Sequence, residues 1–144
     1  MRILLINPPH KSIGSRLPNE HLPPLGLLSI GGPLIDNGNN VKLLDADFYN
    51  YKYDEILNKV LDYQPEIVLL GHSGSSSAQP IINDIATLIK QRNSEIIIVV
   101  GGVFPTFHWK EILESNNSID FIVCGEGEQV ILDLVSAISN KKKI

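Results

Sequence analysis

The sequence predicts one doubly wound α/β domain built on a parallel sheet. Its 144 residues are close to the length of a single domain, and a composition of 43% hydrophobic and 19% charged residues is that of a globular protein. Five short apolar runs rich in Ile and Val alternate with segments of helical periodicity. Because these runs are continuously apolar, each strand is expected to be buried on both faces by helices.

The first half of the chain contains two predicted strands and two predicted helices. Ile3–Ile6 is the first strand, and Leu25–Ile35, apolar almost all round with three internal glycines, is a buried helix that allows close approach of a neighbour. The turn signal Asn37–Asn40 ends this helix. Val41–Leu44 is the second strand, and Tyr53–Tyr63 places its apolar residues on one helical face.

The second half repeats this alternation. Ile67–Leu70 and Ile96–Val100 are predicted strands, and Pro80–Arg92 between them has isoleucines and leucines at helical spacing. Phe121–Val123 is the fifth strand, and Gln129–Ser139 is the last amphipathic helix. Repeated strand–helix alternation of this kind predicts a doubly wound domain.

Ligands of doubly wound domains bind outside the carboxyl ends of the strands. This rule selects five loops as candidates, and the first is a long one with five prolines, which is more often functional than not. The five loops are Asn7–Pro24, Asp45–Asn50, Gly71–Gln79, Gly101–His108 and Cys124–Glu128.

Three common functions of such domains lack their motif. The first loop has neither the Ser/Thr-rich phosphate loop of FMN-binding domains nor a Gly-x-Gly-x-x-Gly dinucleotide motif. A phosphoacceptor domain needs acidic residues after the first strand, an Asp after the third and a Lys after the fifth. This chain has Asn7, Gly71 and Gly125-Glu126 at these places.

Small and polar residues fill the other candidate loops. The loop from His72 through Ser76 could bring backbone amides and hydroxyls close to a polar ligand, or could cap the next helix. Gly101-Gly102 could leave room for a ligand against bare backbone, or form a tight turn. Glu126 and Glu128 could act as an acid/base pair, but capping of a helix start is the favoured interpretation.

Charge and cysteine content exclude further classes. Removing the three terminal lysines from the net charge of −4 leaves −7 on residues 1–140, a body that would repel nucleic acid.

The longest apolar runs are far below the roughly 20 residues of a membrane span. Met1-Arg2 leads into a run too short for a signal peptide, so a cytoplasmic location is expected. A single cysteine, Cys124, cannot form an internal disulfide or hold an iron–sulfur cluster.

Five stretches, taken together, resemble the N-terminal cobalamin-binding domain of cobalamin-dependent radical SAM proteins. This group includes the anaerobic magnesium-protoporphyrin IX monomethyl ester cyclases and many radical SAM methyltransferases. The resemblance covers nearly the whole chain, in order and at the expected spacing. The stretches are Arg2–Pro9, Pro23–Ile30, Val41–Asp47, Val99–Gly102 and Gly125–Glu128.

The resemblance implies a flavodoxin-like (Rossmann-like) five-stranded parallel sheet of order 2-1-3-4-5 that binds cobalamin (vitamin B12). The corrin ring would lie over the carboxyl ends of the strands, with the dimethylbenzimidazole tail in a crevice of the sheet. The implied cofactor-binding residues are Asn7, Pro8, Pro9, His10, His72, Ser73, Gly74, Ser75, Ser76, Gly101, Gly102, Val103, Gly125, Glu126 and Gly127.

No cobalt ligand is implied. Other cobalamin proteins use an Asp-x-His-x-x-Gly loop whose histidine binds cobalt, and the nearest match here, Asn7–Gly14, has Asn for Asp and the wrong spacing. We therefore expect neither His10 nor His72 to bind the metal.

The resemblance also implies a second domain that this chain lacks. A radical SAM domain holds a 4Fe-4S cluster and S-adenosylmethionine on a three-cysteine motif. We therefore expect residues 1–140 to be the cobalamin-binding domain and residues 141–144 to begin a linker to that domain, its partner in the parent chain. No catalytic residue is expected here, because methyl transfer or oxidative cyclisation would need the full-length protein.

Two alternatives stay open. The chain could be a binding or interaction module of the same fold without a cofactor. It could also be a small stand-alone enzyme using Glu126, Glu128 and His72, although no nucleophile–base pair is visible at fixed spacing.

Overall fold

The domain is built on five parallel strands. The computed structural model describes residues 1–9, 21, 23–72 and 76–142. In spatial order the strands are β2 (Asn40–Asp45), β1 (Arg2–Asn7), β3 (Ile67–His72), β4 (Ile97–Gly102) and β5 (Phe121–Val123), and all neighbouring pairs are parallel. The predicted fold class and strand order are confirmed.

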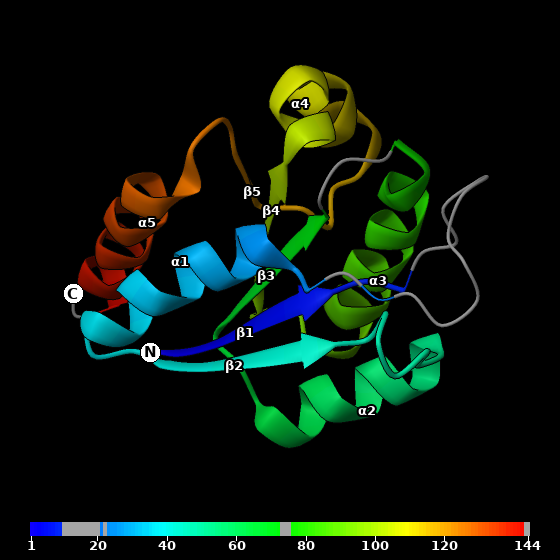
Figure 1. The fold of residues 1–144 in the computed structure, drawn as a ribbon, viewed down its shortest axis with the longest axis horizontal. Helices are drawn as coiled ribbons and strands as arrows, with labels where there is room; N and C mark the ends of the chain where they lie inside the picture. The colour runs from blue at the N-terminus through cyan, green and yellow to red at the C-terminus, as the bar shows by residue number, and fades with distance from the viewer. Residues whose placement is uncertain (10–20, 22, 73–75, 143–144) are drawn as a thin grey trace.

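Helices cover both faces of the sheet (Figure 1). α1 (Leu25–Asp36) and α5 (Gly127–Lys142) pack side by side on one face. α2 (Tyr53–Tyr63) and α3 (Gln79–Arg92) pack together on the other face, and α4 (Val103–Ser115) adds to their core from the end of β4. A short 3₁₀ turn precedes α3.

The strands supply two apolar cores because successive side chains point to opposite faces. In β4, for example, Ile98 and Val100 belong to the core under α2 and α3, whereas Val99 belongs to the core under α1 and α5. All three side chains are at most 2% exposed. Burial on both faces explains why the strands are continuously apolar.

The prediction that α1 is buried all round is only half right. Leu27, Gly31 and Leu34 face the sheet, and a Cβ on Gly31 would lie 3.0 Å from Leu5 Cδ1, so the expected close approach of a neighbour is present. Leu25 and Ile35, however, are 71% and 56% exposed. The sheet covers only one side of a helix, and an even spread of apolar residues does not reveal which side.

The predicted loop Gly101–His108 is wrong, because α4 begins at Val103. Gly102 has φ +119°, a backbone conformation that lets the chain turn from β4 directly into the helix. Pro105 lies in the first helical turn, where proline costs no hydrogen bond. A proline and two aromatic residues without apolar periodicity made this helix start look like a loop.

The last helix is longer than predicted. α5 runs from Gly127 to Lys142 and therefore includes Lys141, which we expected in a linker. The division at residue 140 stays a prediction. Among the residues that the structure describes, no helix combines the length and apolarity needed to cross a membrane.

Candidate functional site

A cavity of about 230 Å³ opens at the carboxyl edge of the sheet. It lies between α1 and α5, above the ends of β3, β4 and β5. This is the edge at which doubly wound domains bind their ligands. Its lining includes an aliphatic wall, a group of glycines and a polar rim.

The cavity exists because two strand positions that face α1 and α5 have no side chain. Leu69 in β3 and Val99 in β4 belong to the core on this face. Side chains alternate along a strand, so Gly71 and Gly101 face the same way. These two glycines are direct partners across the β3–β4 ladder. The aliphatic layer therefore ends at bare backbone, and the space above it stays open.

The two helices complete the wall. Leu27 and Ile30 of α1 line the cavity on one side, and Ile131 of α5 lines it on the other. A Cβ on Gly71 would lie 3.1 Å from Leu27 Cδ2, and a Cβ on Gly127 would lie 3.3 Å from Ile30 Cγ2. Both contacts are tight, so a side chain at either glycine would displace the wall of α1.

Gly102, the last residue of β4, must be glycine for two other reasons. It has a positive φ, and a Cβ on this residue would lie 2.7 Å from the backbone oxygen of His72. No side chain fits at that distance without a shift of β3. The contact keeps the ends of β3 and β4 together at the cavity.

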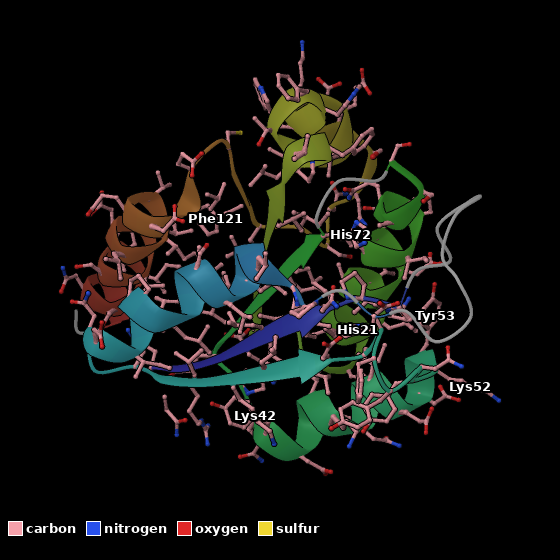
Figure 2. The ribbon with its side chains drawn as sticks, in the orientation of Figure 1. His21, Lys42, Lys52, Tyr53, His72 and Phe121 are labelled. Carbon is pink, nitrogen blue, oxygen red and sulfur yellow. The ribbon has the colours of Figure 1, made fainter. Side chains whose placement is uncertain are left out.

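The rim is polar and open to solvent. His72 ends β3 there, and Figure 2 shows it at the carboxyl edge of the sheet. Glu126 is exposed and Glu128 is half-buried in the first turn of α5, where the helix dipole favours a carboxylate. Val103 adds an exposed apolar side chain at the start of α4.

The hydroxyl of Thr106 joins two sides of the rim. It donates a hydrogen bond of 2.7 Å to the backbone oxygen of Gly102, one helical turn earlier. It also accepts a hydrogen bond of 3.0 Å from the backbone N–H of Gly125, which follows β5. One side chain of α4 therefore holds the two segments that form this part of the rim.

A second polar group lies beside Asn7, at the ends of β1 and β2 (Figure 2). His21 Nε2 is 2.8 Å from Asp45 Oδ2, and His21 Nδ1 is 3.3 Å from Asp47 Oδ2. Asp45 Oδ1 accepts a 2.8 Å hydrogen bond from the Asn7 side-chain amide. His21 thereby contacts the end of β2 and the loop that follows it. In the described part of the chain, no group of His, Cys, Asp and Glu side chains could hold a metal ion.

The structure brings eight of the fifteen predicted cofactor-binding residues to this one cavity. They are Asn7, His72, Gly101, Gly102, Val103, Gly125, Glu126 and Gly127. Among the described residues, Pro8, Pro9 and Ser76 do not line it. His10, Ser73, Gly74 and Ser75 lie outside the described residues.

The sequence did not predict the aliphatic floor and walls of the cavity. Leu27, Leu69, Val99 and Ile131 looked like ordinary core residues, and all four are buried. One signal could have found two of them: where a glycine follows the apolar run of a strand, as Gly71 and Gly101 do, the residue two places before it lies on the same face and must border any hollow there. Thr106 gave no such signal, because its two partners are separated from each other by 23 positions.

A family model matches most of the chain, and two relatives align over nearly its whole length. The family model described as B12 binding domain matches residues 16–135. The chain is 53% identical to the anaerobic magnesium-protoporphyrin IX monomethyl ester cyclase of Synechocystis sp., covering 97% of this chain and 28% of the relative. It is 29% identical to an uncharacterized methyltransferase of Pyrococcus horikoshii, covering 100% of this chain and 31% of that protein. The chain thus spans less than a third of these relatives.

Solved structures share the fold. The cobalamin-dependent S-adenosylmethionine radical enzyme OxsB with aqua-cobalamin bound superimposes with a TM-score of 0.76 at 23% identity, over 96% of this chain and 19% of OxsB. NtrX from Brucella abortus superimposes with a TM-score of 0.58 at 14% identity, over 98% of this chain and 27% of NtrX. At these identities the likeness is one of fold alone.

Proposed function

The chain belongs to the B12 binding domain family, and on this premise we propose that its cavity holds the nucleotide tail of cobalamin. The corrin ring would then lie over the carboxyl ends of the strands. When bound, cobalamin supplies a reactive cobalt centre, which no side chain can provide. The residues of this chain bind the cofactor and set access to it.

The observation that supports this proposal is an aliphatic cavity that Gly71 and Gly101 keep open. A dimethylbenzimidazole base is flat and has a hydrocarbon edge, and it needs a narrow space against backbone, which Gly71 and Gly101 leave open. Leu27 and Ile131 would contact the two faces or edges of the base from opposite helices. The residues present therefore fit the tail of the cofactor.

The rim would meet the more polar parts of the cofactor. A corrin ring has several carboxamide side chains, which donate hydrogen bonds, and the exposed carboxylate of Glu126 is an acceptor at the mouth. His72 and Val103 lie at the same mouth. Pro8, Pro9, His10 and the residues Ser73–Ser76 stay candidate contacts to the cofactor. We assign no residue to cobalt.

The remaining chemistry would belong to a larger parent protein. This chain spans 28% of its Synechocystis relative. One cysteine cannot hold a 4Fe-4S cluster, so cluster and S-adenosylmethionine would bind to a radical SAM domain in the same parent chain. The parent would use cobalamin in methyl transfer or oxidative cyclisation, in the cytoplasm, with neither nucleic acid nor membrane as a partner.

Gly101→Leu tests the site. The position faces the cavity, and a Cβ there would have only ordinary contacts, the nearest 3.6 Å from the Val123 oxygen, so leucine can fill the space without straining the sheet. Gly102 is less suitable, since any side chain there strikes the His72 backbone. We expect Gly101→Leu to abolish uptake of hydroxocobalamin, measured by absorbance titration, and to leave the circular dichroism spectrum unchanged.

Gly32→Leu is the matched control. Gly32 lies on the exposed side of α1 with nothing within 4 Å of its Cβ position, so this variant adds the same side chain away from the cavity. The Gly32→Leu variant should bind hydroxocobalamin as tightly as the unsubstituted 144-residue chain does. Equal affinity in the Gly101 and Gly32 variants would remove the cavity from the site. If the unsubstituted 144-residue chain binds no hydroxocobalamin, the alternative of a cofactor-free module is favoured.

A further inference from the structure

The floor of the cavity is entirely aliphatic. Leu69, Val99 and Ile131 form it, and their side chains are 2%, 2% and 1% exposed. All three belong to the apolar core between the sheet and the helices α1 and α5. Whatever part of a ligand goes deepest therefore meets only hydrocarbon side chains.

The polar side chains that line the cavity elsewhere are engaged or lie at its mouth. The Asn7 amide donates to Asp45 at 2.8 Å, and the Ser29 hydroxyl donates to the Gly26 oxygen at 2.9 Å. Glu126 and Glu128 sit at the start of α5 and His72 at the end of β3, all on the rim. None of these groups is in the aliphatic floor.

From this arrangement we infer that the cavity selects cobamides by the base of their nucleotide tail. The inference rests on the proposed function. The edge of dimethylbenzimidazole that lies away from its ribose consists of a benzene ring and two methyl groups, which match a hydrocarbon floor. The corresponding edge of adenine has ring nitrogens and an amino group. In the cavity these polar groups lose water and meet Leu69, Val99 and Ile131.

The cost is that of burying polar groups without partners. Each unpaired buried donor or acceptor weakens binding by roughly tenfold or more. A base that lies in the cavity would no longer be bound to the cobalt of its own cofactor. This release from cobalt does not by itself favour cobalamin over the adenine cobamide. Dimethylbenzimidazole is the more basic ligand, so its release costs cobalamin more than the release of adenine costs the adenine cobamide. A preference for cobalamin must therefore come from the cavity.

Three probes test the inference on the 144-residue chain. Dissociation constants are measured by absorbance titration for cobalamin, for the adenine cobamide (pseudocobalamin) and for cobinamide, which has no base. We expect cobalamin to bind tightest, with the adenine cobamide weaker by roughly tenfold or more.

The outcomes distinguish failure of the inference alone from failure of the proposed function. Equal affinity for cobalamin and the adenine cobamide, with cobinamide much weaker, would overturn the selectivity and leave the tail site in place. Equal affinity for cobalamin and cobinamide would overturn both, because the base would not be in the cavity. Absence of binding by all three probes would also overturn both.

A pair of isosteric variants locates the selectivity. Val99→Thr puts a hydroxyl in the floor, where it can pair with a purine nitrogen, and should narrow the preference for cobalamin several-fold. Val100→Thr makes the same change one residue later, on the opposite face of β4 in the core under α2 and α3. Val100→Thr should lose about as much stability as Val99→Thr. It should keep the preference for cobalamin over the adenine cobamide that the unsubstituted chain has. If either variant fails to fold, the ratio of the two dissociation constants, for cobalamin and for the adenine cobamide, measured on the unsubstituted chain still tests the selectivity.

Discussion

At the scale of the residue, Thr106 controls the shape of the rim. Its hydroxyl is donor to Gly102 and acceptor from Gly125, two residues with positive φ on different sides of the cavity. A glycine has no side chain that could fix its segment by packing, so this hydroxyl contributes directly to the position of both segments. Thr106 itself does not line the cavity, and its effect on a ligand would be one of positioning.

Thr106→Val should therefore weaken cobalamin binding several-fold. The substitution keeps the shape of the side chain and removes both hydrogen bonds, at a stability cost of about 1 kcal/mol. Thr106→Ser restores the hydroxyl and should recover most of the affinity. The measurement is the cobalamin dissociation rate of both variants beside their thermal unfolding. Identical dissociation rates in the Val and Ser variants would exclude a positioning role.

At the scale of the element, α2 and α3 are joined by a polar contact as well as by their core. The Tyr53 hydroxyl, at the start of α2, donates a hydrogen bond of 3.1 Å to Asp84 Oδ2 of α3. Burial raises the pKa of Tyr53 above its ordinary value of 10.0, and the hydrogen bond to Asp84 and the charge of Asp84 raise it further. This contact stabilises the fold only while the phenol keeps its proton.

The pH dependence of this contact has a definite sign. Because the pKa is raised in the folded state, its contribution to stability is complete below pH 10.0 and is lost as the pH rises through the folded-state pKa. Tyr53→Phe should reduce the free energy of unfolding by about 0.5–1.5 kcal/mol at pH 7. The difference from the parent should shrink above pH 10.0.

Urea unfolding at pH 7 and above pH 10 checks this expectation. Tyr49→Phe is the control, since Tyr49 is 61% exposed on the loop before α2. It should change stability little at either pH. A Tyr53→Phe deficit of the same size at both pH values would contradict the assignment.

At the scale of the whole molecule, the two faces of the sheet differ in how completely they are filled. The face under α2, α3 and α4 is packed as far as Leu70 in β3 and Val100 in β4. The face under α1 and α5 is packed only as far as Leu69 and Val99 and is hollow above them. The core under α2, α3 and α4 contributes to stability without bordering the cavity. The domain can therefore leave a cavity on its other face.

The isolated chain should bind cobalamin and still have no radical chemistry. Its only thiol, Cys124, could give one ligand where a cluster needs three or four. After anaerobic reconstitution we expect no stoichiometric iron or sulfide and no 5′-deoxyadenosine from S-adenosylmethionine. Detection of either with residues 1–144 alone would show that the chain has a catalytic centre of its own.

The sequence by itself determined the five strands, the helices α1, α2, α3 and α5, and their order. Strands such as Ile67–Leu70 and helices such as Tyr53–Tyr63 depend on periodicity within a few residues, so their bounds could be predicted to within two or three positions. The carboxyl-edge rule then placed the ends of separate strands at one site. Most of the cavity-lining glycines were found in this way.

Only the tertiary structure decided what those glycines create. Gly71 and Gly101 are 30 positions apart and become partners only in the β3–β4 ladder. The walls from α1 and α5, the start of α4 at Val103 and the contact of His21 with Asp45 likewise depend on segments brought together by folding. Such distant pairings follow from the packing of whole elements, and no local pattern in the chain encodes them.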